Sequence, residues 1–496
     1  MTTEIDRISQ IRLEKLERIR QLGITPYPNS YKRTHTTAQA LALLKQQEEG
    51  PAGTIEISLA GRIMARRSMG KITFIDLRDG SGKIQLFFNH SNLNEKDNLL
   101  FKELDIGDII GVRGTIFRTR TGEPTLNVKS LTLLTKSLQS LPEKWHGLTD
   151  DDIRHRQRYL DLISNPAVKQ TFETRSKIVT AIRQFLNNRG FIEVETPVLQ
   201  PSAGGALARP FITHHNALDQ DFYLRIALEL HLKRLIVGGF DKVYEIGRVF
   251  RNEGISVKHN PEYTLLESYE AYADYNDVMS MVEEMISTVC IQVLGSTEVK
   301  YGEHTLNFKP PWKRISLRDA VTQFSGIDFV QYPEAELLRQ KMREKGLEVD
   351  PKKNWAKLVD ELISTFVEPQ LIQPTFLIDY PVSLSPLAKT RVDNPRIVER
   401  FEGFAGGFEI ANAFSELNDP VEQRARFVEQ LREREGYGDE QWTIDEDFLQ
   451  ALEYGMPPTG GLGIGIDRLV MVLTDQHSIR EVILFPQLKN KQNDQA

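Results

Sequence analysis

The sequence contains a single cysteine, Cys290, among its 496 residues. One thiol excludes an internal disulfide framework and any site built only from cysteine ligands, and it is typical of a reducing compartment. No apolar run approaches the roughly 20 residues that a membrane-spanning helix needs. The first ten residues, MTTEIDRISQ, contain an early acid and no apolar stretch, so a signal peptide is not expected. We therefore expect a cytoplasmic protein with no membrane partner.

Several common nucleotide-binding and hydrolase motifs are also missing. The chain has no phosphate loop of the G-x-x-x-x-G-K-[ST] type and no G-x-G-x-x-G fingerprint followed by a suitable acid. The glycine-rich run at 461–465 lacks the lysine of a phosphate loop, and no G-x-S-x-G elbow is present. Any nucleotide must therefore be held by another arrangement of side chains.

Charge is present in ordinary amount but is unevenly distributed. The total of 62 Lys and Arg against 69 Asp and Glu gives a net charge of −7. Residues 1–145 carry 22 cations against 16 anions, a net of +6, whereas residues 146–496 carry 40 against 53, a net of −13. A basic segment can follow a phosphate backbone, so the acidic total does not exclude a nucleic-acid partner.

The basic segment predicts a helix followed by a small β-barrel. Residues 5–22 place apolar side chains at helical spacing among arginines and lysines, and we favour docking on its own domain over RNA contact. Five strand-like pieces between 55 and 134 match the partly open barrel of an OB-fold. Phenylalanines there alternate with cations, as on a single-strand-binding face, although a strand phenylalanine is more often core. The residues concerned are Phe74, Phe87, Phe88, Arg62, Arg66, Arg67 and Lys71.

Beyond a turn-rich segment near residues 141–152, helices and strands are mixed. A helix is expected at 176–190, ending at Gly190, and Pro197 restricts the strand at 191–199 to the edge or end of a sheet. This pattern predicts an α+β fold. Further strands are expected at 241–252, 374–382, 409–417 and 480–486, and further helices at 275–294 and 421–436.

Three segments carry the most specific motifs. They are the helix and strand at 175–198, the sequence GRVFRNEGISVKHNPEYTLLESYEAY at 247–272, and GGLGIGIDRLVMVL at 460–473. Together they resemble motifs one, two and three of class II aminoacyl-tRNA synthetases. With the barrel and GFEIANAFSELND at 407–419, the chain resembles a bacterial lysyl-tRNA synthetase of subclass IIb from about residue 55 to the end.

The resemblance implies a domain organisation. An N-terminal helix and an OB-fold anticodon-binding domain would occupy 1–145, a linker or hinge 146–165, and a class II catalytic domain 166–496. The catalytic domain would be an antiparallel sheet flanked by helices. Motif one forms a dimer interface in this family, so a homodimer is implied.

The expected ATP site is centred on two arginines. Arg251 and Glu253 stand two apart on an expected strand and would face one side, where the simplest alternative is an ion pair. A guanidinium can contact a carboxylate and a phosphate together. The resemblance makes Arg251 and Arg468 the catalytic residues, and it implies Mg²⁺ bound by Glu402 and Glu409, with no zinc. The implied ATP-binding set is Arg251, Glu253, His259, Asn260, Tyr263, Glu402, Glu409 and Arg468.

The expected amino-acid pocket is acidic. A buried cation needs paired anions and hydrogen-bond acceptors, and the resemblance implies that Glu267, Tyr269 and Glu416 hold the lysine ε-ammonium group. Glu229 would bind the α-ammonium group, and Phe414 would wall the aliphatic stem. The implied lysine-binding set is Gly205, Glu229, Arg251, Glu267, Tyr269, Asn412, Phe414, Glu416 and Gly463.

In the barrel, FIDLRDGSGKIQLFF resembles the anticodon-reading strands of the subclass. Phe74 matches the stacking aromatic residue, Gln85 a base-reading amide and Phe87 a second platform, which reverses the preference for a core role of Phe74. The chain departs from the family pattern at three positions. These are Leu228, where proline is usual, His231, where another aromatic residue is common, and Tyr263, where phenylalanine is more frequent.

The expected activity is ATP-dependent attachment of lysine to the 3′-end of tRNA(Lys) through a lysyl-adenylate. An aspartyl- or asparaginyl-tRNA synthetase shares this architecture, but an aspartyl enzyme would need cations where Glu267 and Glu416 stand. A non-catalytic RNA-binding relative would be expected to lose Arg251 or Arg468. A relative that lysylates a protein would resemble the catalytic body without the barrel.

Overall fold

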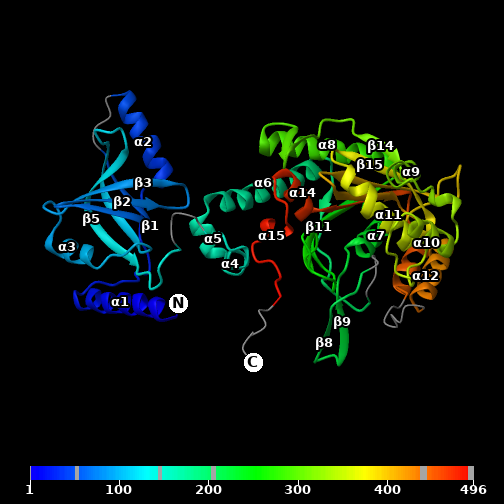
Figure 1. The fold of residues 1–496 in the computed structure, drawn as a ribbon, viewed down its shortest axis with the longest axis horizontal. Coiled ribbons are helices and arrows are strands. Elements are labelled where there is room, and N and C mark those ends of the chain that lie inside the picture. The colour runs from blue at the N-terminus through cyan, green and yellow to red at the C-terminus, as the bar shows by residue number, and fades with distance from the viewer. Residues whose placement is uncertain (1, 51–54, 143–147, 203–207, 436–443, 490–496) are drawn as a thin grey trace. The chain divides into compact units, whose positions relative to one another are not determined.

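The computed structural model describes residues 2–50, 55–142, 148–202, 208–435 and 444–489. The chain divides into two compact units, Met1–Thr149 and Asp150–Ala496 (Figure 1). Both units contain helices and strands, so the expected α+β class is confirmed. Across the described ranges, no helix is long and apolar enough to cross a membrane.

The first unit is a five-stranded barrel with three helices. Strand β1 pairs with both β2 and β4, so the barrel is closed, whereas the sequence predicted a partly open one. Ile75 and Leu86 point into the core, and their neighbours Phe74 and Phe87 are half-buried on the other face. The elements are α1 (Thr2–Gln21), α2 (Thr37–Glu49), β1 (Glu56–Met69), β2 (Ile72–Arg78), β3 (Lys83–Asn89), α3 (Glu95–Lys102), β4 (Ile109–Arg118) and β5 (Pro124–Thr135).

Helix α1 packs on this barrel through hydrogen bonds and ion pairs of its cationic side chains. Arg12 donates to three backbone carbonyl oxygens at 2.7–3.0 Å. Lys15 pairs with Asp105 at 2.5 Å, and Arg18 pairs with Glu103 at 3.0 Å. The predicted docking of the helix on its own domain is therefore confirmed.

The second unit is built on an eight-stranded sheet. Its order is β14-β15-β16-β17-β18-β11-β10-β6, and neighbouring strands are antiparallel except in the pairs β14–β15 and β10–β6. The short strand β6 is at the sheet edge, as Pro197 predicts. The strands are β6 (Ile192–Glu193), β10 (Lys242–Phe250), β11 (Glu262–Ala271), β14 (Lys313–Ser316), β15 (Thr375–Pro381), β16 (Ile397–Ala405), β17 (Phe408–Ser415) and β18 (Thr459–Gly465).

Alternation along the central strands gives this sheet two different faces. Leu266 and Ala413 join an apolar core with helices α6 (Pro166–Asn188), α8 (Tyr275–Leu294) and α14 (Ile466–Leu473). The next residues along the same strands, Glu267 and Phe414, line a cavity instead. The sheet therefore separates the main core from the candidate site.

Smaller elements complete the second unit. Two further apolar clusters pack helices α7 and α13 on one part of the sheet and α9 to α11 on another. The remaining elements are α4 (Asp151–Arg156), α5 (Arg158–Ser164), β7 (Leu199–Gln200), β8 (Ile212–His215), β9 (Gln220–Leu224), α7 (Glu229–Val237), β12 (Glu298–Tyr301), β13 (His304–Asn307), α9 (Leu317–Ser325), α10 (Ala335–Glu344), α11 (Trp355–Leu362), α12 (Pro420–Glu435), α13 (Glu446–Glu453) and α15 (Ile479–Val482).

Two segments differ from the sequence predictions. The described part of the predicted linker forms α4 and α5, and its fully buried Arg158 donates to the backbone carbonyl oxygens of Arg480 and Leu484 at 2.7 and 3.1 Å. The strand expected at 480–486 is wrong, because helix α15 occupies its first half. Long-range pairing of α4 and α5 with this C-terminal segment is not visible in local sequence patterns.

Candidate active site

A cavity of about 540 Å³ opens on the strand face opposite the main core. Its lining comes mainly from β11, β16, β17, β18, helices α7 and α14 and the loop after β10, with further residues from 384–388 and α12. Gly205 lies outside the described residues. The other fifteen predicted residues all line the cavity: Glu229, Arg251, Glu253, His259, Asn260, Tyr263, Glu267, Tyr269, Glu402, Glu409, Asn412, Phe414, Glu416, Gly463 and Arg468.

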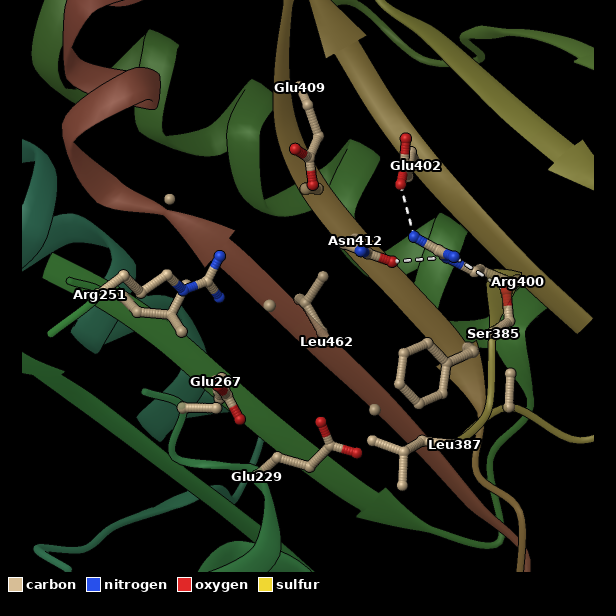
Figure 2. Close-up of a pocket in the computed structure, with 18 of the residues that line it drawn as sticks. Glu229, Arg251, Glu267, Ser385, Leu387, Arg400, Glu402, Glu409, Asn412 and Leu462 are labelled. Carbon is tan, nitrogen blue, oxygen red and sulfur yellow. Dashed lines mark hydrogen bonds and ion pairs between the residues drawn. The ribbon is translucent and has the colours of Figure 1, made fainter. Parts of the chain in front are cut away.

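Arg251 and Glu253 lie in the loop after β10, because that strand ends at Phe250. The prediction that they share a strand face is therefore wrong. The Arg251 guanidinium lies 5.4 Å from the centroid of the Tyr263 ring, and its Nε is 3.5 Å from the carbonyl oxygen of Ile226. Within the described residues it forms no ion pair with Glu253, so the guanidinium is available to a ligand (Figure 2).

A second cationic group lies at the start of α14. Arg468 donates to Glu409 Oε2 at 2.9 Å and is 3.2 Å from His259 Nε2. Burial, and then the charge of Arg468, lowers the pKa of His259. A neutral imidazole beside this arginine adds no charge, so Arg468 with Arg251 makes this end of the cavity suited to an anion.

Arg400 organises the far wall, although no sequence motif predicted it as a site residue. Figure 2 shows its guanidinium between Glu402, Asn412 and Ser385. It lies 2.5 Å from Glu402, 3.1 Å from Asn412 Oδ1 and 2.8 Å from Ser385 Oγ. Tyr380 donates to the other oxygen of Glu402 at 2.7 Å. One partly buried arginine therefore positions two predicted ligand residues on neighbouring strands.

Glu402 and Glu409 lie on β16 and β17 and influence each other electrostatically. Burial raises the pKa of Glu402 to about 7, and the Arg400 charge opposes this shift. In the described parts of the chain, no group of three or more His, Cys, Asp or Glu side chains is arranged to hold a metal. Any ion bound by these two carboxylates would need further oxygen ligands from water or a substrate.

The opposite end of the cavity is acidic and deeply buried. Glu229, Glu267 and Glu416 are 7%, 5% and 1% exposed (Figure 2 labels the first two). Tyr269 donates its hydroxyl to Glu267 at 3.0 Å, as expected for residues on one face of β11. Oxygen Oε1 of Glu416 has no hydrogen-bond partner within the described residues. An unpaired buried carboxylate oxygen is costly, so this position calls for a cationic ligand.

A glycine makes room for Glu416. A Cβ atom on Gly461 would lie 1.8 Å from Glu416 Oε1 and 2.8 Å from the Tyr269 ring. Any larger residue at 461 would displace the carboxylate. The glycine-rich run that fails as a phosphate loop thus has a steric role beside the acidic residues.

Two departures from the family pattern, Leu228 and His231, lie at the start of helix α7. The backbone N–H of Leu228 donates to Glu267 Oε1 at 3.0 Å, a bond that proline could not form. Burial, and then the charge of Glu229, raises the pKa of Glu267 to about 7, and the Leu228 N–H opposes that shift. His231 is half-buried on α7, with Nδ1 3.4 Å from Gln200, and does not line the cavity.

The predicted RNA-binding face of the barrel is only partly cationic. The rings of Phe74 and Phe87 are 5.4 Å apart on the outer face, and Gln85 accepts a hydrogen bond from Thr125 at 3.0 Å. Phe88 is fully buried in the core. Two of the interleaved cations serve the barrel itself: Arg62 donates to Gly107 O at 2.8 Å, and Arg66 donates to Leu104 O at 3.0 Å.

Comparison with protein families agrees with this architecture. The family described as tRNA synthetases class II (D, K and N) matches residues 150–489. The family described as OB-fold nucleic acid binding domain matches residues 57–134. The fold and the cavity therefore define a class II tRNA synthetase of the D, K and N group.

Several curated relatives cover nearly the whole chain. The Lysine--tRNA ligase of Dehalococcoides mccartyi (strain ATCC BAA-2266 / KCTC 15142 / 195) is 62% identical over 97% of both chains. That of Moorella thermoacetica is 57% identical over 97% of this chain and 98% of the relative, and that of Roseiflexus sp. (strain RS-1) is 54% identical over 98% and 99%. The chain belongs to the class II tRNA synthetases and, among them, to the lysine–tRNA ligase family.

Proposed function

We propose that the chain activates L-lysine with ATP and attaches it to the 3′-end of tRNA(Lys). The observation that carries this proposal is the buried acidic end of the cavity, where Glu416 presents an unpaired carboxylate oxygen. The ε-ammonium group of lysine satisfies Glu416, Glu267 and Tyr269, and Glu229 takes the α-ammonium group. An aspartate side chain would meet like charges at the same place, which disfavours the aspartyl alternative.

The cationic end of the cavity suits the chemistry of activation. A carboxylate oxygen of lysine attacks the α-phosphorus of ATP, the bond to the bridging oxygen breaks, and pyrophosphate leaves with the bonding electrons. Arg251 neutralises the lysine carboxylate and the α-phosphate, and Arg468 holds the γ-phosphate. Glu253, His259, Asn260 and Tyr263 complete the nucleotide site, and Asn412, Phe414 and Gly463 the lysine site, with Gly205 beside it.

The second step needs no protein nucleophile. A hydroxyl of the terminal adenosine of tRNA attacks the lysyl carbonyl carbon, and AMP leaves with the electrons of the mixed-anhydride bond. Side chains contribute by positioning the reactants and balancing charge.

We propose that Glu402 and Glu409 bind Mg²⁺ together with the phosphates of ATP. Oxygen ligands suit this ion, which usually takes one or two carboxylates plus substrate phosphates. Bound Mg²⁺ would neutralise phosphate charge. Arg400 and Tyr380 orient Glu402, and Arg468 orients Glu409.

We propose that the barrel domain, residues 1–145, reads the anticodon through Phe74, Gln85 and Phe87. Its net charge of +6 favours a polyanion, and the paired rings offer stacking surfaces to unstacked bases. Residues 166–496 would be the catalytic domain, with 146–165 between the two. We further propose a homodimer formed through motif one, in the cytoplasm.

Amino-acid-dependent exchange of pyrophosphate into ATP tests the function directly. With the twenty amino acids supplied one at a time, exchange is expected with lysine and not with aspartate or asparagine. Exchange with aspartate instead of lysine would refute the assignment.

A further inference from the structure

Lys233 lies directly beneath the acidic end of the cavity. Its side chain, on α7, is fully buried and does not line the cavity. Its Nζ is 2.5 Å from Glu229 Oε1 and forms an ion pair with Glu416 Oε2. The rings around the ammonium group, with centroids 5.5–6.0 Å away, are Phe414, Phe448 and Tyr269. The ammonium group thus bonds two carboxylates that both reach the cavity.

The charges around Lys233 are strongly coupled. Burial alone would lower the pKa of Lys233, but the charges of Glu229 and Glu416 outweigh it and raise the pKa. Burial raises the pKa of Glu416 well above its usual value, and the Lys233 charge opposes that shift. Glu267 and Tyr269 face the same carboxylates from β11. Among the described residues, Lys233 is the cation whose charge opposes the raised pKa values of both Glu267 and Glu416.

We propose that Lys233 is a positioning residue for the amino-acid pocket: its ammonium group pairs with the carboxyl groups of Glu229 and Glu416, holds them in place and supplies the positive charge inside the cluster. With all three carboxyl groups ionised, as beside a bound dication, the three glutamates and Lys233 carry a net charge of −2, which matches the two ammonium groups of a diamino acid such as free lysine. The inference rests on the proposed function, because that function supplies the ligand. It adds a residue that touches no substrate and acts through the two glutamates.

The first test is the pH dependence of stability in Lys233→Met, which keeps the length of the side chain and removes its charge. The folded variant must then hold protons on buried carboxyl groups whose pKa values exceed those of the unfolded chain. Such groups stabilise the fold at low pH, and that contribution is lost as pH rises. The loss in Tm relative to the wild type is expected to be about 5 °C larger at pH 8 than at pH 6. An equal loss at both pH values would mean that Lys233 only fills space.

The second test separates the two substrates in the pyrophosphate exchange reaction. Lys233→Met is expected to raise the KM for lysine at least about tenfold, because Glu229 and Glu416 lose a charge-assisted bond. The KM for ATP should stay within about twofold, since the anion-binding arginines are untouched. An unchanged KM for lysine, or an equal rise for both substrates, would overturn the proposal.

The barrel offers a matched control in Lys136, a second fully buried lysine that pairs with two carboxylates, Asp105 and Asp108. Lys136→Met should lower Tm but leave both KM values of exchange at wild-type levels. A similar rise in lysine KM in this control would show that the Lys233 result reflects general destabilisation.

If Lys233→Met fails to fold, the double variant Lys233→Met/Glu416→Gln tests whether Lys233 balances the charge of the glutamates. It restores the charge number of the cluster, so it is expected to fold and to lose the pH-dependent part of the Tm deficit. Failure of this variant to fold as well would overturn the charge-balancing role. Absence of lysine-dependent exchange in the wild type would instead refute the proposed function, and the stability tests would still judge the pairing of Lys233 with the glutamates.

Discussion

The two units each bury a lysine among carboxylates. Only one of the two clusters is closed, meaning that every oxygen of the carboxylates paired with the lysine has a bonding partner within the described residues. In the barrel, Lys136 donates to Glu103 O, Asp105 and Asp108 at 2.6–3.1 Å. Asp108 also accepts the backbone N–H groups of Asp105 and Ser137 at 2.8 Å. The three ammonium protons have three acceptors. Each carboxylate oxygen of Asp105 and Asp108 also has a partner, so this cluster leaves none of these polar atoms unpaired for a ligand.

In the catalytic unit, the corresponding cluster is left open. Lys233 bonds two carboxylates, and Oε1 of Glu416 has no hydrogen-bond partner within the described residues. Glu229, Glu267 and Glu416 also line the cavity. A buried ion cluster therefore stabilises a fold when all its polar atoms are paired. It forms a binding site when one carboxylate oxygen is left unpaired for the substrate.

The largest expected effect comes from removing the charge at the open cluster. Glu416→Gln should raise the KM for lysine by at least about 100-fold, because breaking a buried charge pair costs about 3–5 kcal/mol. ATP binding should change little. Measurement of both KM values in pyrophosphate exchange checks this, and equal losses for the two substrates would remove Glu416 from the side-chain pocket.

The matched change at the closed cluster is Asp108→Asn, which should reverse the pattern. The free energy of unfolding is expected to fall by about 3 kcal/mol, while the KM for lysine stays at the wild-type value. Denaturant unfolding and exchange kinetics measure the two quantities. A lysine-binding defect in this variant would break the distinction between the clusters.

The next largest effect concerns the Leu228 N–H that bonds Glu267. Leu228→Pro removes this donor, and the native φ of −99° also lies outside the range of proline. A hydrogen bond to a charged group is worth about 1.5–3 kcal/mol, so the KM for lysine should rise about tenfold or more. Leu228→Met keeps the N–H and the volume, and its lysine KM should match the wild type. Equal effects of the two changes would assign the loss to packing.

Phe74→Ala tests the barrel as a separate functional surface. Loss of one stacking contact costs about 1–3 kcal/mol, so the KM for tRNA in the charging reaction should rise about fivefold or more. Pyrophosphate exchange, which needs no tRNA, should stay at the wild-type rate. A parallel loss in exchange would count against an anticodon role.

The smallest expected effect is a pH dependence of lysine binding, which only the cluster beside the cavity should show. Burial, and then Glu229, raises the pKa of Glu267 to about 7, so below pH 7 a cationic substrate must displace its proton. The KM for lysine should therefore rise as pH falls from 8 to 6, by at most about tenfold. In the barrel, burial acts to raise the pKa of Asp105, but hydrogen bonds from Lys136 and Lys15 outweigh it and lower the pKa. Glu267→Gln should flatten the kinetic profile, and a flat profile in the wild type would contradict the shift.

Much of the site was predictable because its residues lie in short motifs. The Glu267–Tyr269 pair follows from the two-residue repeat of a strand, and the position of Arg468 follows from a glycine before an apolar helix. Glu229 and Lys233 are four apart on α7, a spacing typical of a helical ion pair, so this signal was present in the sequence. It did not show that Glu416, 183 residues further on, completes the cluster.

Other features had no local signal. Arg400 precedes Glu402 on β16, and only the pairing of β16 with β17 brings Asn412 to the same guanidinium. The strand that carries Arg251 was expected to run from 241 to 252, whereas β10 stops at Phe250. Helix α5 is held by backbone carbonyl oxygens of the C-terminal segment through Arg158, and α4 by the ion pair of Arg154 with Glu481.

The two-part charge distribution, the barrel strands and the three motifs could be predicted from the chain alone, because each depends on neighbours within one element or one loop. The predicted site residues followed from the family resemblance that those motifs carry. Which carboxylate oxygens have a bonding partner, and which are left for a ligand, became visible only in the folded structure. The bonding state of a buried charge depends on every element packed against it, and those elements meet only when the sheet and its helices assemble.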